Sequence, residues 1–197
     1  MIRWSTNQAN SRFLQLPPNV REIIYKYTLG GKTINISYET YRITSDFTKP
    51  KVPRQVVPIF KYRCTVLDGK MNPFHAAAKP YIKTQSSFTM LNGICRQLYM
   101  ETATLPYKLN VMCFGSHNIM FNFLLMEQRL SRQQLDTITQ LLLPDSLPGP
   151  AMLAYLRNLE KVYLVYQQME KSPGWYHVDW KEGEEPRLRP NLKGRGP

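Results

Sequence analysis

The sequence has few of the residues that build disulfide frameworks and metal centres, and it has no long apolar run. It contains three cysteines and three histidines in 197 residues. Cys64, Cys95 and Cys113 fit neither a paired disulfide framework nor CxxC spacing, so we expect buried free thiols in a reducing compartment. No stretch approaches the ~18 apolar residues that span a bilayer, and the first residues lack the apolar centre of a secretory signal. These absences predict an intracellular protein, cytoplasmic or nuclear, that does not associate with membranes.

Motifs for catalysis and cofactor binding are also missing. His75, His117 and His177 stand apart from each other and from the cysteines, so we expect no metal site. Gly30 and Gly31 end a helical pattern and precede a strand, which is the reverse of the order in a phosphate-binding loop. No GxSxG motif is present, and the 14 acidic residues are scattered. We therefore expect a protein that is not an enzyme and that holds no cofactor.

Acidic residues are scarce relative to basic ones. The chain has 26 Lys and Arg against 14 Asp and Glu, a net charge of +12, which attracts anionic partners. Half of this excess lies between Asp46 and Lys83, where eight basic residues face two acidic ones (8 − 2 = +6). Interleaved cations and aromatics are typical of nucleic-acid surfaces, although strand alternation predicts that Phe60 and Tyr62 point inward. If residues 46–83 do not bind nucleic acid, we expect them to form a solvated loop or a protein contact. The candidate nucleic-acid-binding residues are Lys49, Lys51, Arg54, Lys61 and Arg63.

Hydrophobic residues make up 43% of the chain, enough for the core of one self-supporting domain. Polar composition predicts a flexible N-terminus over residues 1–12. Proline, glycine and charge predict a disordered tail over residues 181–197. The domain then spans residues 13–180, with a basic, proline-rich insertion at about 45–85.

Periodicity predicts a helix in the first part of the domain, followed by strands. Val20, Ile23, Ile24 and Tyr27 recur at helical spacing, with Pro18 in the first turn. Alternating patterns predict strands over residues 32–38 and 60–66, and helical spacing predicts one long central helix over about 91–105.

The second half of the chain alternates strand and helix patterns. Strands are predicted near 110–114, 137–143 and 160–167, and helices at 116–126, after Ser131 with Gln134 three residues later, and at 150–158. An edge strand is predicted at 174–180. The predicted fold is a single α/β domain with an N-terminal helix, a strand pair, a long central helix and a βαβαβ half carrying a small, partly parallel sheet.

Two stretches, LPPNVREIIYKYTLGGKTINI and LNGICRQLYMETATLPYKLNVMCF, resemble a group of mostly uncharacterised fungal F-box-like proteins. That group carries an "LPxEIRxxIY" helix, a "CRQxYxE" helix and a "Y..N.F.F" strand. The resemblance implies a substrate adaptor that docks on a Skp-type protein of a cullin-RING ubiquitin ligase, with the rest of the domain binding a substrate. The matching residues downstream are Cys95, Arg96, Gln97, Tyr99, Glu101, Tyr107, Asn110, Phe114, Leu159, Val162 and Leu164, and the implied docking residues are Leu16, Pro17, Val20, Ile23 and Ile24.

A second interpretation of the first helix stays open beside docking. Its only apolar stripe could instead be buried against the sheet, and we favour this core interpretation because a helix must cover the core with some face. Asn19 replaces the acidic residue of the pattern, and the strand that begins after Gly31 predicts an incomplete docking unit. For Arg96 and Glu101 we favour an internal ion pair over a ligand site. The sequence does not predict the oligomeric state.

Overall fold

The computed structural model describes residues 9–44, 55–75, 90–168, 171–181 and 183–191. One sheet of seven strands runs through them in the order β2-β1-β3-β4-β5-β6-β7. The pairs β1–β3, β3–β4 and β4–β5 are parallel, and the pairs β1–β2, β5–β6 and β6–β7 are antiparallel. This arrangement confirms the predicted α/β class and the partly parallel sheet.

Helices α2 and α3 lie before the sheet in the described part of the chain. Helix α2 (Arg12–Gln15) begins where the Ser11 side chain accepts a hydrogen bond from the Leu14 amide, and α3 (Pro18–Leu29) carries proline in its first turn. Gly30 is the C-cap of α3, and glycine is required there because a Cβ would lie 2.6 Å from the carbonyl oxygen of Lys26. Gly31, with φ of +73°, then turns the chain into the sheet.

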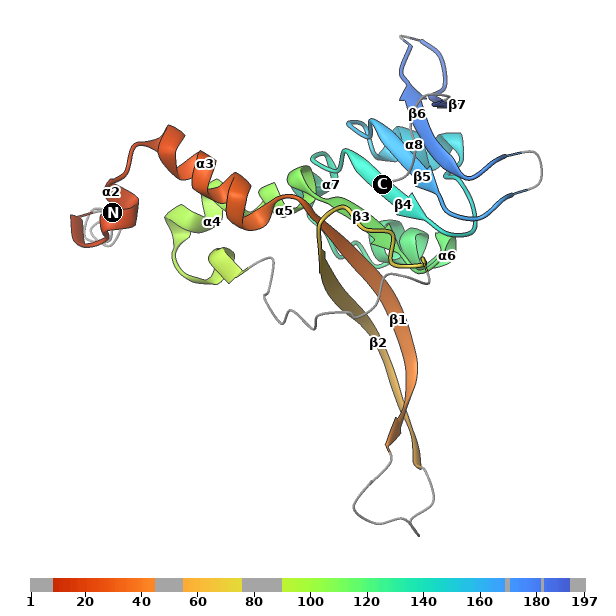
Figure 1. The fold of residues 1–197 in the computed structure, drawn as a ribbon, viewed down its shortest axis with the longest axis horizontal. Coiled ribbons are helices and arrows are strands. Elements are labelled where there is room, and N and C mark those ends of the chain that lie inside the picture. The colour runs from red at the N-terminus through yellow and green to blue at the C-terminus, as the bar shows by residue number, and fades with distance from the viewer. Residues whose placement is uncertain (1–8, 45–54, 76–89, 169–170, 182, 192–197) are drawn as a thin grey trace.

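Strands β1 (Lys32–Thr44) and β2 (Gln55–Asp68) form an antiparallel pair longer than predicted. Figure 1 shows this β1–β2 arm projecting well beyond the other strands. Its register shifts between Glu39 and Tyr41, opposite Phe60, which has φ of +49°. This bulge changes the alternation of side chains, so Phe60 is 65% exposed rather than pointing inward as predicted.

The segment predicted as one long central helix forms three short helices instead. These are η1 (Met90–Gly93), α4 (Arg96–Thr102) and α5 (Leu105–Leu109). Cys95 has an extended backbone, with φ of −157° and ψ of 163°, which interrupts the helical hydrogen bonds. Pro106 lies in the first turn of α5, where proline favours the start of a new helix.

The βαβαβ half follows the predicted order. Strand β3 (Val111–Phe114) leads to α6 (His117–Phe121), the π-helix η2 (Asn122–Met126) and α7 (Arg132–Leu135). Strand β4 (Gln140–Leu143), α8 (Pro150–Tyr155) and β5 (Lys161–Leu164) come next. The predicted capping box of Ser131 and Gln134 is present at α7. These helices pack on one sheet face and form the main core, which includes Ile34, Met112, Phe114, Met120, Leu124, Leu135, Leu141, Met152, Leu153, Val162 and Leu164.

The C-terminal part differs from the prediction at two places. Strand β6 (Gly174–Asp179) is not an edge strand, because β7 (Arg187–Pro190) pairs with it in antiparallel register. Strand β7 lies inside the segment predicted to be disordered. The extra strand extends the sheet on the side opposite β2.

The three cysteines are free, as predicted, but they are not equally buried. Cys113 lies inside the sheet, Cys95 is half-buried and Cys64 is exposed on β2. The prediction of a buried thiol is therefore wrong for Cys64, which lies on β2, the edge strand of the sheet.

Candidate functional site

The predicted apolar stripe of α3 faces away from the core. Val20, Ile23 and Tyr27 are 36%, 52% and 85% exposed, and Ile24 is half-buried. These four residues are called the α3 face below. The interpretation that they are buried against the sheet is wrong for the first three. Of the other predicted docking residues, Pro17 is exposed and Leu16 is half-buried.

A different row of residues turns inward, which explains why the stripe is left outside. Arg21, Tyr25 and Leu29 are the buried residues of α3, spaced four apart along one side of the helix. Tyr25 and Leu29 pack with Leu14 and with Leu98 of α4 in a small apolar cluster. Sequence reasoning missed this row because Arg21 interrupts its hydrophobic pattern.

Arg21 is only 5% exposed, and Glu101 of α4 neutralises it. The guanidinium donates from Nε to Glu101 Oε2 at 3.0 Å and from Nη2 to Glu101 Oε1 at 2.7 Å. Tyr25 Oη donates to Oε2 at 2.7 Å, and Gln97 Nε2 donates to Oε1 at 3.1 Å. We call Arg21, Tyr25, Gln97 and Glu101 the polar cluster.

Arg21 also donates from Nη1 to the carbonyl oxygens of Leu14, at 3.1 Å, and Leu16. It thereby joins the turn before α3 to the helix. The expected partner of Glu101 was Arg96, which is exposed instead. The expectation of an internal ion pair is right for Glu101, and the choice of its partner is wrong.

The polar cluster joins the two stretches that carry the family resemblance. Partial burial acts to raise the pKa of Glu101, but the hydrogen bonds from Arg21, Tyr25 and Gln97 outweigh it, so the pKa is lowered. Desolvation, followed by the hydrogen bond to Glu101, raises the pKa of Tyr25. Glu101 is therefore held as a carboxylate and Tyr25 as a neutral donor. The cluster fixes α3 on α4, and its groups are occupied by one another.

Asn110, another residue of the resemblance, has a structural role. Its Nδ2 donates to the carbonyl oxygens of Leu29 and Pro106 at 2.7 and 2.8 Å, and its Oδ1 accepts from the Lys32 amide at 2.8 Å. One side chain therefore ties the end of α3 to α5 and to the start of β1. Together with the polar cluster, it holds the α3 face in a fixed orientation.

The predicted nucleic-acid residues are brought together only in part. Lys49, Lys51 and Arg54 lie outside the described residues. Lys61 is exposed on the β1–β2 arm, and Arg63 forms an ion pair with Glu39 at 2.7 Å. The described arm therefore presents one unpaired cation of the predicted set beside the exposed Phe60.

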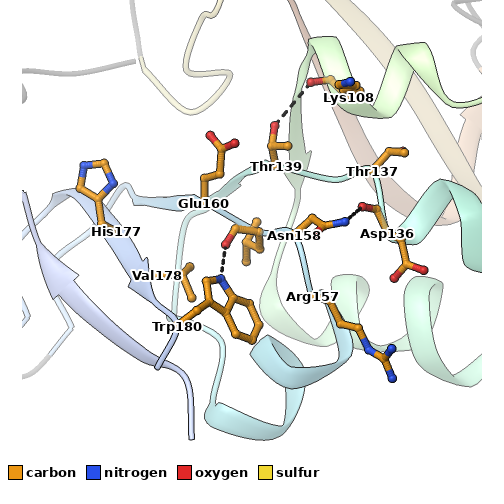
Figure 2. Close-up of a pocket in the computed structure, with 11 residues that line it drawn as sticks. Lys108, Asp136, Thr137, Thr139, Arg157, Asn158, Glu160, His177, Val178 and Trp180 are labelled. Carbon is orange, nitrogen blue, oxygen red and sulfur yellow. Dashed lines mark hydrogen bonds between the residues drawn. The ribbon is translucent and has the colours of Figure 1, made fainter. Parts of the chain in front are cut away.

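A groove of about 600 Å³, open to solvent, lies where the chain enters β4 and β5. Figure 2 shows its lining: Lys108 at the end of α5, Asp136, Thr137 and Thr139 before β4, residues 157–160 before β5, and His177, Val178 and Trp180 at the end of β6. Sequence reasoning missed this groove, because its residues come from four distant segments and share no motif.

The structure offers no metal centre and no membrane span within the part of the chain that it describes. No three histidine, cysteine or acidic side chains gather there to hold an ion. None of the described helices is long and apolar enough to cross a bilayer.

Comparison with known proteins shows the family of the chain and no activity. No curated protein and no solved structure matches the sequence. One family, described as a domain of unknown function (DUF7730), matches residues 6–183. That range includes α3, the polar cluster, the β1–β2 arm and the groove, so the chain belongs to the DUF7730 family.

Proposed function

We propose that this chain is a non-enzymatic protein-interaction module that docks a partner through the α3 face. The observation that carries the proposal is the exposure of Val20, Ile23 and Tyr27 along one side of a single helix. Exposed apolar side chains that share a helix face are typical of surfaces that another protein covers. A partner that covers them would remove apolar area from water at little structural cost to this chain.

The support beneath α3 strengthens this proposal. Helices α4 and α5 pack against its inner side although they follow the β1–β2 arm in the sequence. Helix α3 therefore has helical neighbours, although a strand begins directly after Gly31. A helix that is already fixed loses little conformational entropy when a partner binds it.

The resemblance to fungal F-box-like proteins suggests which partner fits. We propose that the α3 face binds a Skp-type protein and that the chain serves as a substrate adaptor of a cullin-RING ubiquitin ligase. Leu16, Pro17, Val20, Ile23 and Ile24 are the residues that the resemblance assigns to docking, and Tyr27 extends the same face by one turn.

Binding to a purified Skp-type protein tests this proposal. Ile23→Asp places a charge in the centre of the α3 face and Tyr27→Ala removes its most exposed ring, so each should weaken binding by about tenfold or more in calorimetry. Val57→Asp is the matched control, because Val57 is an exposed apolar residue of β2 and Figure 1 shows the β1–β2 arm pointing away from α3.

Thermal unfolding separates loss of contact from loss of structure. Tyr27 is 85% exposed, so Tyr27→Ala should leave the melting temperature unchanged. Unchanged binding by both α3 variants, or no binding by the original chain, would contradict the docking proposal.

A second candidate function is binding of nucleic acid by the basic segment. The observation that favours it is the position of Lys61, exposed beside Phe60 on an arm that projects from the sheet. A cation next to an exposed aromatic ring can contact a phosphate and a base together.

A further inference from the structure

We propose that the groove between α5, the loops before β4 and β5, and the end of β6 binds a short, extended peptide segment. We infer that this peptide places an apolar side chain on Trp180 and charged side chains of both signs beside it. Peptide binding follows from the groove itself. The inference that the peptide is the substrate of an adaptor rests on the proposed function.

The backbone that forms the groove is fixed before any ligand arrives. The carbonyl oxygen of Thr139 accepts hydrogen bonds from the amides of Glu160 and Lys161 at 2.9 and 3.2 Å. The Val178 amide donates to the Glu160 carbonyl oxygen at 2.9 Å, and Asn158 Nδ2 donates to the Asp136 carbonyl oxygen at 2.5 Å. These bonds link the loops before β4 and β5 to β6. A preformed site of this kind binds with a small entropic cost.

Trp180 provides an apolar surface at one end of the groove. Its Nε1 donates to the carbonyl oxygen of Leu159 at 3.0 Å, which holds the ring in place, and the residue remains 42% exposed. Figure 2 shows the ring beside Val178, with Glu160 above them. An oriented and partly exposed indole can take an aliphatic or aromatic side chain, or a cation over its face.

Charged side chains of opposite sign line the same groove. Lys108 and Arg157 carry positive charge and Glu160 carries negative charge, and none of the three forms an ion pair with another described residue. A ligand that bears both signs of charge would complement them. A nucleic-acid backbone would not, since its phosphates would be repelled by Glu160. Charge complementarity therefore favours a peptide.

The size and openness of the groove agree with a peptide. Its volume of about 600 Å³ lies within the range of ligand sites. Small-molecule sites enclose most of their ligand, whereas this groove is open to solvent. An extended chain can lie along such a groove with its two ends in solvent.

The position of the groove lets both proposed sites be occupied at once. Trp180 follows β6, and three strands separate β6 from β1, the strand that follows α3. Figure 1 places α3 and β6 on opposite sides of the molecule. A peptide in the groove would leave Val20, Ile23 and Tyr27 open to a second partner.

A phage-displayed library of random twelve-residue peptides, selected on the full chain, tests the inference. Enriched peptides should share an apolar residue with charged neighbours, and their affinity can be measured by fluorescence anisotropy with a labelled copy. Trp180→Ala should raise Kd by about tenfold or more, and Trp180→Phe should restore most of the binding. Glu160→Lys should weaken the same peptides, and a peptide whose matching positive residue is exchanged for glutamate should bind this variant again.

The controls separate this inference from the proposed docking function. Ile23→Asp should bind the peptides as the original chain does, even if it no longer binds a Skp-type protein. Glu160 is exposed, so Glu160→Lys reports on the groove even if Trp180→Ala destabilises the chain.

Two results would overturn the inference. One is the recovery of no enriched peptides, or of peptides whose Kd is the same for Trp180→Ala, Glu160→Lys and the original chain. The other is displacement of the peptides by a single-stranded oligonucleotide whose own binding falls in Lys108→Ala and Arg157→Ala, which would assign the groove to nucleic acid. Either result would leave the docking of α3 untouched.

Discussion

At the scale of single residues, the buried arginine of α3 decides which side of the helix meets the core. Arg21 satisfies its donors with Glu101 and two backbone carbonyl oxygens, so it can be buried where a lone charge could not. The polar cluster does not need to add net stability to set this orientation. A buried ion pair contributes little over an apolar pair, but removing one partner leaves an uncompensated charge.

Glu101→Ala should therefore be strongly destabilising. It removes the carboxylate that neutralises Arg21 and that accepts from the Tyr25 hydroxyl, and we expect a loss of about 3 kcal/mol in the free energy of unfolding measured with urea. Glu22→Ala is the matched control, because Glu22 pairs with Lys26 on the exposed side of the same helix and should cost less than about 0.5 kcal/mol. Equal effects of the two substitutions would contradict the role assigned to the polar cluster.

The stability that Glu101 contributes should depend on pH. The pKa of Glu101 is lowered in the folded state, so its contribution is present above the pKa of an unfolded glutamate and is lost as pH falls through the lower folded value. The difference in unfolding free energy between the original chain and Glu101→Ala should thus be constant near neutral pH. It should shrink below about pH 4. A difference that grows on acidification would contradict the direction of the shift.

At the scale of elements, the β1–β2 arm has two parts with different support. Near the sheet, the Tyr62 ring packs on Phe123 of η2 with centroids 5.0 Å apart, and its hydroxyl donates to Glu127 at 2.7 Å. Arg129 lies 5.4 Å above the same ring. Desolvation and the bond to Glu127 raise the pKa of Tyr62 to about 12, so the hydroxyl stays a donor at neutral pH. Beyond the bulge at Phe60, β1 and β2 pair with each other only among the described strands.

Hydrogen exchange should reveal these two parts. A two-stranded ribbon alone is marginally stable in water, so the amides of Tyr41–Thr44 and of Val56 and Val57 should exchange faster than those of residues 33–37. Tyr62→Ala should increase exchange around residues 36–39 and leave β4 and β5 protected. Tyr41 is an exposed aromatic residue on the far side of the bulge, so Tyr41→Ala should change exchange neither around residues 36–39 nor in β4 and β5. Uniform protection along the whole arm would contradict this division.

At the scale of the whole molecule, the net charge of +12 creates a field that attracts anionic partners of any kind. The field increases encounter rates and depends on salt, but it does not by itself select a partner. Selection would have to come from local features such as the α3 face, the groove or the cations of the arm.

The nucleic-acid candidate predicts a specific response to salt. If the arm binds a single-stranded oligonucleotide, log Kd should rise steeply and linearly with log salt, and Lys61→Gln should reduce that slope by about 0.7 if Lys61 neutralises one phosphate. Neutralising Lys49, Lys51 and Arg54 together should reduce it further. Lys181→Gln, at an exposed cation beyond β6, is the control. Binding that does not respond to salt, or that is unchanged in all these variants, would contradict this function.

The sequence by itself determined the order and type of most elements. The alternation of strand and helix patterns from Val111 onward predicts the parallel strands β3, β4 and β5, and the Ser131–Gln134 spacing predicts the start of α7. These features depend on neighbouring residues, because hydrogen-bonding periodicity and capping act over three or four positions. The break at Cys95 was missed because an apolar helical spacing can continue through a residue whose backbone is extended.

Only the tertiary structure decided what the α3 helix presents to its surroundings. Its periodicity predicts one apolar row, Val20, Ile23, Ile24 and Tyr27, and favours burial of this row in the core over docking of a partner. The opposite row is buried instead, because Glu101, 80 positions away, neutralises Arg21. A buried charge is favourable only when its partner is in place, and no local pattern can show whether a distant partner arrives. The groove could not be predicted for the same reason, because its lining residues are distant in the sequence and come together only when β4, β5 and β6 have paired.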